Sequence, residues 1–140
     1  MTDLTTLLAE RACERLMLEY CECVDTRNFE RLVQLFSKDG VLKRPVEGEI
    51  KGRAAIKAFF DKLTTDPLIH VCSNNLISVT GLKTAEATSY VTVFRSYSRN
   101  AEGLPKLEAP YVVAKYVDRF VVEEGEWKIG FRDTIFSAKV

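Results

Sequence analysis

The chain contains one histidine, His70, which is the first candidate for chemistry. It follows Pro67-Leu68-Ile69, in a segment whose residue types favour a strand. Because side chains alternate along a strand, one face should carry Leu68, His70, Cys72, Asn74 and Leu76. An imidazole titrates near pH ~6.5 and can act as a general acid or base. A packed histidine that bonds a carbonyl is the alternative, and the sequence leaves both interpretations open.

Two residues of the first helical segment are candidate partners for this imidazole. Asp25 lies where the apolar pattern of that segment ends, so its carboxylate either turns inward to orient a histidine or is solvated at the helix end. Tyr20 lies on the apolar stripe, where a phenol either bonds a substrate oxygen or completes the core. Five residues correspond to about 140° on an ideal helix, so the two converge only if the helix ends near Val24. We take His70, Asp25 and Tyr20 as the candidate catalytic residues.

Other side chains are expected to bind a ligand or to have no chemical role. Most aromatic residues should pack in the core, and a few should line a pocket. The expected substrate contacts are Asn74, Phe36, Phe60, Tyr90, Phe94 and Trp127. Cys72 is interpreted as a small packed side chain. Asp118 and Arg132 are interpreted as charges at the surface or the sheet edge, with pairing inside a cavity mouth as the alternative. The sequence shows no glycine-rich phosphate loop and no nucleophile elbow, and we expect no cofactor. Long strands predict a strongly bent sheet, whose concave side is expected to hold a small-molecule ligand.

The four cysteines argue against a metal site. Cys13, Cys21 and Cys23 fall within a helical pattern, and Cys21 and Cys23 point apart on a helix. With one histidine in the chain, a zinc site lacks ligands, so no metal is expected. A secreted disulfide framework would not place three cysteines on one helix. Reduced thiols in a cytoplasmic protein are therefore the simpler expectation.

The order of the predicted elements places helices before strands. Apolar residues at spacings of three and four predict a helix over 4–24 with Asp3 as its N-cap, and further helices over 29–36, after Asn28, and 53–63. A short strand is expected at 41–43 and a loop at 48–52. Residues 68–80, 84–98, 107–123 and 126–137 are rich in strand formers, and Pro110 suggests a late start for the third. Long strands joined by short turns predict an antiparallel meander in an α+β fold.

Composition excludes several classes of protein. The 140 residues are 46% hydrophobic and 29% charged, with 20 basic and 20 acidic side chains. This size and composition predict one globular domain over 1–140. A balanced charge gives no electrostatic footprint for nucleic acid or an anionic membrane surface. No apolar stretch approaches the ~20 residues of a membrane span, and the N-terminus does not resemble a signal peptide.

The order and spacing of several short motifs resemble those of SnoaL-like proteins, which belong to the nuclear transport factor 2-like superfamily. The resemblance covers roughly residues 10–133. It rests on residues 14–20, Val24-Asp25, residues 28–36, Lys38-Asp39-Gly40, residues 52–60, His70 with Asn74, residues 85–90, Tyr116-Val117-Asp118, residues 125–129 and Arg132. It implies a cone-shaped α+β barrel, in which three N-terminal helices close a strongly curved antiparallel sheet around a pocket. In dehydratase-type members an aspartate ending the first helix and a histidine on the first long strand meet in that pocket, and Asp25 and His70 match these positions.

The expected function follows from these residues and this resemblance. The first hypothesis is a cofactor-independent lyase or isomerase that dehydrates, isomerises or cyclises a small apolar molecule bearing a carbonyl or hydroxyl. His70 would transfer the proton, Asp25 would orient it, and Tyr20 or Asn74 would bond the substrate oxygen. A non-catalytic binding module and a small structural subunit of an oxygenase-like complex are the alternatives. By fold analogy a homodimer is expected.

Overall fold

The computed structural model describes residues 3–140, and within that range it contains three helices and six strands. The helices are α1 (Leu4–Asp25), α2 (Phe29–Gln34) and α3 (Arg53–Asp61). The strands are β1 (Phe36–Arg44), β2 (Gly48–Lys51), β3 (Leu68–Val79), β4 (Thr84–Arg95), β5 (Val112–Glu123) and β6 (Glu126–Lys139). The predicted helices and long strands are confirmed, and β5 begins after Pro110 as expected. The segment 48–51, predicted as a loop, is instead a strand that pairs with β1.

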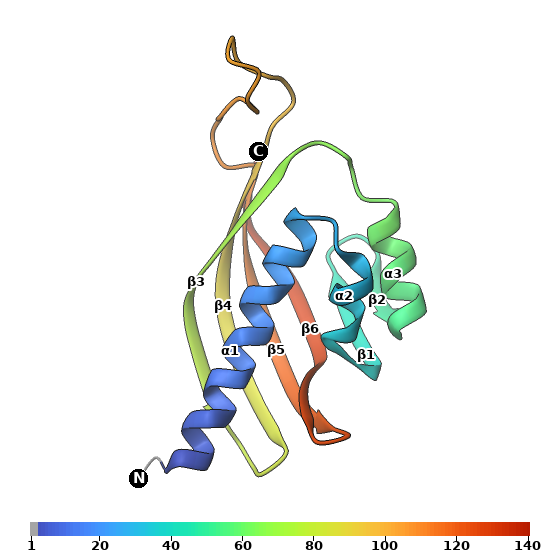
Figure 1. Cartoon of the computed structure of the whole chain (residues 1–140), viewed down its shortest axis with the longest axis vertical. Coiled ribbons are helices and arrows are strands. Elements are labelled where there is room, and N and C mark those ends of the chain that lie inside the picture. The colour runs from blue at the N-terminus through green and yellow to red at the C-terminus, as the bar shows by residue number, and fades with distance from the viewer. Residues whose placement is uncertain (1–2) are drawn as a thin grey trace.

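The six strands form one open sheet in the order β2-β1-β6-β5-β4-β3. The long strands β3 to β6 pair as the predicted antiparallel meander. The first strand departs from the wholly antiparallel expectation, because β1 lies parallel to β6 and makes the sheet mixed. Figure 1 shows α1 lying across β3 to β6, while α2 and α3 lie beside β1 and β2. Helices that cover one face of a sheet are the expected α+β arrangement.

Capping side chains fix where the first two helices begin. The Asp3 carboxylate accepts from the Thr6 amide at 2.8 Å, and the Asn28 side chain accepts from the Arg31 amide at 3.2 Å. The middle and end of α1 bury their apolar face against the sheet. The predicted stripe is wrong at the start of the helix, where leucines 4, 7 and 8 are exposed, because this end of α1 reaches the margin of the sheet (Figure 1). None of the helices within residues 3–140 is long and apolar enough to cross a membrane.

A bulge interrupts β3 and changes which side chains face α1. Ser73 pairs with Tyr90 and Leu76 with Thr88, so Asn74 and Asn75 together face one residue of β4. Asn74 adopts a left-handed φ of 55° and is exposed. The predicted face Leu68, His70, Cys72, Asn74, Leu76 is therefore wrong beyond Cys72, since a bulge moves later side chains to the opposite face. Asn75 takes the inward position and accepts a hydrogen bond from the Cys72 thiol at 3.3 Å.

Gly40 lies where β1 approaches β6, and the two strands leave no room for a side chain there. A Cβ on this residue would lie 2.9 Å from the Phe36 Cβ, 3.0 Å from the Ser37 oxygen and 3.1 Å from the Ile129 oxygen. Because two of these atoms belong to the backbone, we expect Gly40→Ala to lower the free energy of unfolding by about 1–3 kcal/mol. Chemical denaturation measures this change. Gly130→Ala is the matched control, because its Cβ would meet neighbours at an ordinary 3.5 Å. Equal stability of the two variants would contradict the expectation.

Candidate active site

His70 and Asp25 meet between β3 and the end of α1. The His70 Nδ1 lies 2.6 Å from one Asp25 oxygen, and the His70 backbone amide donates to the other oxygen at 2.8 Å. The two side chains are 11% and 21% exposed. An ionised carboxylate only accepts hydrogen bonds, so Nδ1 carries a proton, and in the neutral imidazole Nε2 then carries the lone pair. The second oxygen fixes the carboxylate in place, so the imidazole has one tautomer and one orientation.

Helix α1 ends at Asp25, the residue whose carboxylate contacts the imidazole of His70. Arg27 takes a left-handed φ of 58°, and its guanidinium donates to the Thr64 carbonyl at 2.9 Å. The chain thus leaves the helix directly after Asp25 and Thr26. A carboxylate at a helix C-terminus faces the negative end of the helix dipole, which disfavours it by roughly 0.3–1 kcal/mol. Both hydrogen bonds from His70 offset this cost, so the position of Asp25 depends on its partner.

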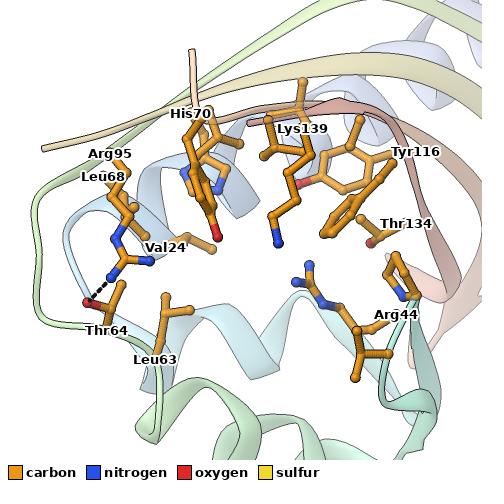
Figure 2. Close-up of a pocket in the computed structure, with 18 of the residues that line it drawn as sticks. Val24, Arg44, Leu63, Thr64, Leu68, His70, Arg95, Tyr116, Thr134 and Lys139 are labelled. Carbon is orange, nitrogen blue, oxygen red and sulfur yellow. Dashed lines mark hydrogen bonds between the residues drawn. The ribbon is translucent and has the colours of Figure 1, made fainter. Parts of the chain in front are cut away.

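The imidazole forms part of the wall of a cavity of about 240 Å³ between the helices and the sheet. An apolar cavity of about 150 Å³ accommodates benzene, so this volume suits a guest with one or two rings. Figure 2 shows His70, Tyr116, Thr134, Arg44 and Lys139 around this space. The apolar and aromatic part of the wall includes Val24, Phe59, Phe60, Leu63, Leu68, Val91, Val93, Tyr111, Val112, Ala114 and Phe136. A mostly apolar wall with a few polar groups is typical of small-molecule sites.

Two phenols line the cavity beside His70. The ring centroids of Tyr20 and Tyr116 are 5.8 Å apart in an edge-to-face arrangement. Burial raises the pKa of both hydroxyls above the usual value, so both remain protonated and can donate a hydrogen bond to a guest oxygen. Thr134, which pairs with Tyr116 across β5 and β6, also lines the cavity. Its buried hydroxyl has no hydrogen-bond partner among residues 3–140, which is a reason to expect a polar atom of a guest there.

The predicted ligand contacts divide between the cavity and other places. Phe60 lines the cavity, and Phe36 lies behind it with its ring centroid 6.2 Å from that of Tyr20. The rest do not line this cavity. Tyr90 and Phe94 alternate with the inward-facing Val91 and Val93 of β4 and so lie on its opposite face. Trp127 lies in a separate depression beside the start of α1, and Asn74 faces solvent because of the bulge.

Behind the two tyrosines lies the ion pair of Arg132 and Asp118. The sequence favours the surface or the sheet edge for these two residues and leaves pairing inside a cavity mouth as the alternative. Arg132 donates to both oxygens of Asp118 at 2.7 and 2.8 Å, and both side chains are 0% exposed. The guanidinium carbon lies 4.3 Å from the Tyr20 ring centroid and 3.9 Å from that of Tyr116. These contacts, with cation–π character, fix the rings that form the cavity wall. Arg132 and Asp118 are therefore positioning residues for the two phenols.

Cys72 is also more than a packed side chain. It lies two residues after His70, and the thiol of Cys21 on α1 is close to it. The Cys21 thiol has the largest effect in lowering the pKa of Cys72 to about 6; the Arg132 charge acts in the same direction, and burial opposes both. Burial instead raises the pKa of Cys13 to about 12. No sequence spacing reveals this contact, because it joins a helix to a strand.

Alkylation kinetics can test the Cys72 environment. At neutral pH we expect iodoacetamide to modify Cys72 before the three helical cysteines, because Cys72 is half-buried with a lowered pKa while the others are buried with raised pKa values. Mass spectrometry of peptides against pH should give a midpoint near 6. Cys72→Ser should leave only the slow background reaction. A midpoint near ~8.5, the usual value for a free cysteine, would contradict the lowered pKa.

Several side chains that line the cavity could not be identified from the sequence. Tyr116 and Thr134 lie at inward positions of β5 and β6, and the inward face is known only once the strand register is fixed. No sequence motif distinguishes Arg44 or Lys139 from the other basic residues, yet both line the cavity. Among residues 3–140 no group of three or more metal-ligating side chains gathers, so the site is built from hydrogen-bonding and cationic groups.

Comparisons with known proteins agree with this fold. A provisionally assigned scytalone dehydratase from Novosphingobium aromaticivorans is 25% identical, with a TM-score of 0.82 over 97% of this chain and 89% of that one. An NTF2-like protein with a cystatin-like fold from the same organism is 26% identical, with a TM-score of 0.79 over 98% and 92%. The hexachlorocyclohexane dehydrochlorinase LinA-type3 from Novosphingobium barchaimii is 17% identical, with a TM-score of 0.83 over 99% and 93%, and shares the fold.

Among functionally curated proteins, no sequence matches this chain. The family model for the SnoaL-like domain matches residues 5–133, a range that contains Tyr20, Asp25, His70 and the buried Asp118–Arg132 pair. The match extends from the first turns of α1 into β6, so it includes the elements that place these residues. The chain belongs to the SnoaL-like domain family.

Proposed function

We propose that this protein is a cofactor-independent lyase or isomerase acting on a small, mostly apolar molecule that bears a carbonyl or hydroxyl. The reaction class is dehydration, isomerisation or cyclisation by proton abstraction and return. The observation that carries the proposal is the 2.6 Å contact between Asp25 and the Nδ1 of His70, whose side chain lines the cavity. An imidazole whose tautomer is fixed by a carboxylate is a general base with its second nitrogen free to act.

The chemistry assigned to each residue follows from its position. Nε2 of His70 takes a proton from a carbon next to the substrate carbonyl, and the Asp25 carboxylate stabilises the resulting imidazolium. The electrons of the broken C–H bond move to the carbonyl oxygen, where the neutral phenols of Tyr20 and Tyr116 donate hydrogen bonds. The imidazolium then returns the proton, either to carbon in an isomerisation or to a leaving hydroxyl, which departs as water. Asn74 is exposed and takes no part.

The family relationship supports a lyase or isomerase over other activities. A structure provisionally assigned as a scytalone dehydratase is similar along almost the whole chain at 25% identity. This chain has only one histidine, so a dehydration here relies on His70 alone for both proton abstraction and return. The phenols and the Thr134 hydroxyl supply the remaining hydrogen bonds to the substrate.

Hydrogen exchange on a panel of candidate compounds tests the proposal. Small cyclic ketones and hydroxyketones, each of one or two rings, are incubated with the protein in D₂O, and mass spectrometry detects deuterium at carbon or loss of water. We expect at least one compound to exchange faster than in buffer, with no added metal or cofactor. Ligand-induced thermal shifts are measured on the same compounds. Binding without exchange or product across the whole set would instead favour a non-catalytic binding module.

The outer face of the sheet supports the proposal of a homodimer. Apolar side chains on it remain exposed, namely Ile69, Val71, Leu76, Tyr90, Val117 and Ile135. A patch of this kind on one face is able to pair with its own copy about a two-fold axis. Light scattering should give twice the chain mass, and Val71→Lys should reduce the measured mass to that of a monomer.

We further expect a cytoplasmic protein, where the four free cysteines stay reduced.

A further inference from the structure

Two cationic side chains converge in the cavity away from any acid–base role. Arg44 ends β1 and Lys139 ends β6, two strands that lie side by side in the sheet. Figure 2 shows the guanidinium of Arg44 and the ammonium of Lys139 pointing toward one another inside the cavity. Both lie near the ring of Phe136, with the Arg44 carbon 5.7 Å and the Lys139 nitrogen 5.5 Å from its centroid. The aromatic wall thus holds both cations in place without neutralising them.

The protein supplies little counter-charge for these two groups. The buried Nε of Arg44 has no hydrogen-bond partner among residues 3–140, and its nearest carboxylate, that of Glu47, lies 3.9 Å away. Within the same range Lys139 forms no ion pair. Arg95, a third cation in the wall, is instead held by Asp66 through contacts of 2.7 and 2.9 Å. Arg44 is half-buried and Lys139 is exposed, although both line the cavity. Like charges that face each other repel, so an anion between them would be stabilised.

We propose that Arg44 and Lys139 bind a carboxylate of the substrate, whose apolar body then extends along the aromatic wall toward His70. This inference rests on the proposed function of the same cavity and narrows its substrate class to carboxylic acids of one or two rings. A planar carboxylate matches the edge of a guanidinium through two parallel hydrogen bonds, and Arg44 has a free Nε to offer. Glu47 also lines the cavity and would repel a dianion more than a monoanion, which favours a carboxylate over a phosphate.

Two ligands of the same shape, of which only one is charged, measure how much the charge contributes to binding. Naphthoate and naphthamide have the same body, and only the first is an anion, so calorimetric titration of both measures the contribution of the charge. We expect the wild-type protein to bind naphthoate about ten-fold more tightly, a difference of about 1.4 kcal/mol. Arg44→Gln and Lys139→Gln should each remove most of this preference, because each weakens naphthoate binding much more than naphthamide binding. Lys139 is exposed, so its variant tests the site even if Arg44→Gln disturbs folding.

Exposed cations outside the cavity provide the controls. Arg11→Gln and Lys83→Gln lose the same charge but should not alter either ligand. Equal affinity for naphthoate and naphthamide in the wild type would overturn the carboxylate site and leave the proposed proton-transfer function standing. Tighter binding of naphthyl phosphate than of naphthoate would overturn the assignment to a monoanion. Failure of both naphthoate and naphthamide to bind would overturn this inference together with the ligand-binding cavity on which the proposed function rests.

Discussion

His70→Ala is expected to reduce turnover by about 10²–10⁴-fold, because it removes the group that transfers the proton. The fold should persist, since His70 is partly exposed and the Asp25 carboxylate it leaves is accessible to water. Asp25→Asn should also reduce turnover, but by changing the tautomer of the imidazole rather than by removing it. An amide donates to Nδ1 and moves the imidazole proton to Nε2, the nitrogen that must act as the base; the comparable change in a serine-protease triad lowers kcat by about 10⁴-fold.

The measurement is the rate of deuterium incorporation or water loss with a compound found by the exchange screen. Ser73→Ala is the matched control, because Ser73 is an exposed polar residue of the same strand outside the cavity. It should retain the wild-type rate. Thermal melting of all three variants separates loss of chemistry from loss of structure. Full turnover by a well-folded His70→Ala protein would remove the imidazole from the mechanism.

The extent to which sequence anticipated this site depends on whether local or long-range structure sets each position. Helical periodicity and the capping residues Asp3 and Asn28 act within a few residues, and they located the helices correctly. The proximity of Asp25 and His70 came from the family resemblance, because the residues are far apart in the sequence. Asn74 was misplaced by a bulge that no alternation pattern reveals. Whether a strand residue faces the cavity or the outside depends on which face the helices cover.

The positions of the charged residues likewise cannot be predicted from the sequence without the strand pairing. Asp118 and Arg132 lie on β5 and β6 and pair across the sheet register, which places two charges at directly opposed, inward positions. A pattern of single charges in apolar strands is equally consistent with an outward position, so their burial follows only from the fold. Arg44 and Lys139 likewise enter the cavity because β1 runs parallel to β6, a pairing that the turn signals do not predict.

The largest effect on stability is expected from breaking the buried pair on one side. Asp118→Ala leaves the Arg132 guanidinium charged, fully buried and without its counterion. Removing one partner of a buried ion pair costs about 3–5 kcal/mol, because the remaining charge stays desolvated. Chemical denaturation should show a loss of this size. Asp66→Ala is the matched control, because its pair with Arg95 is 36% and 25% exposed and should be worth at most ~1 kcal/mol.

A double variant distinguishes the contribution of the two buried charges to stability from that of the volume their side chains fill. Arg132→Met together with Asp118→Leu removes both charges and fills much of the same volume, so it should recover most of the stability lost in Asp118→Ala. Its ligand affinity should nevertheless fall, because the tyrosine rings that form the cavity wall lose the guanidinium between them, 4.3 and 3.9 Å from their centroids. A stable double variant with unchanged ligand binding would mean that the ion pair supports the core alone, whereas recovered stability with weakened binding identifies it as the element that positions Tyr20 and Tyr116.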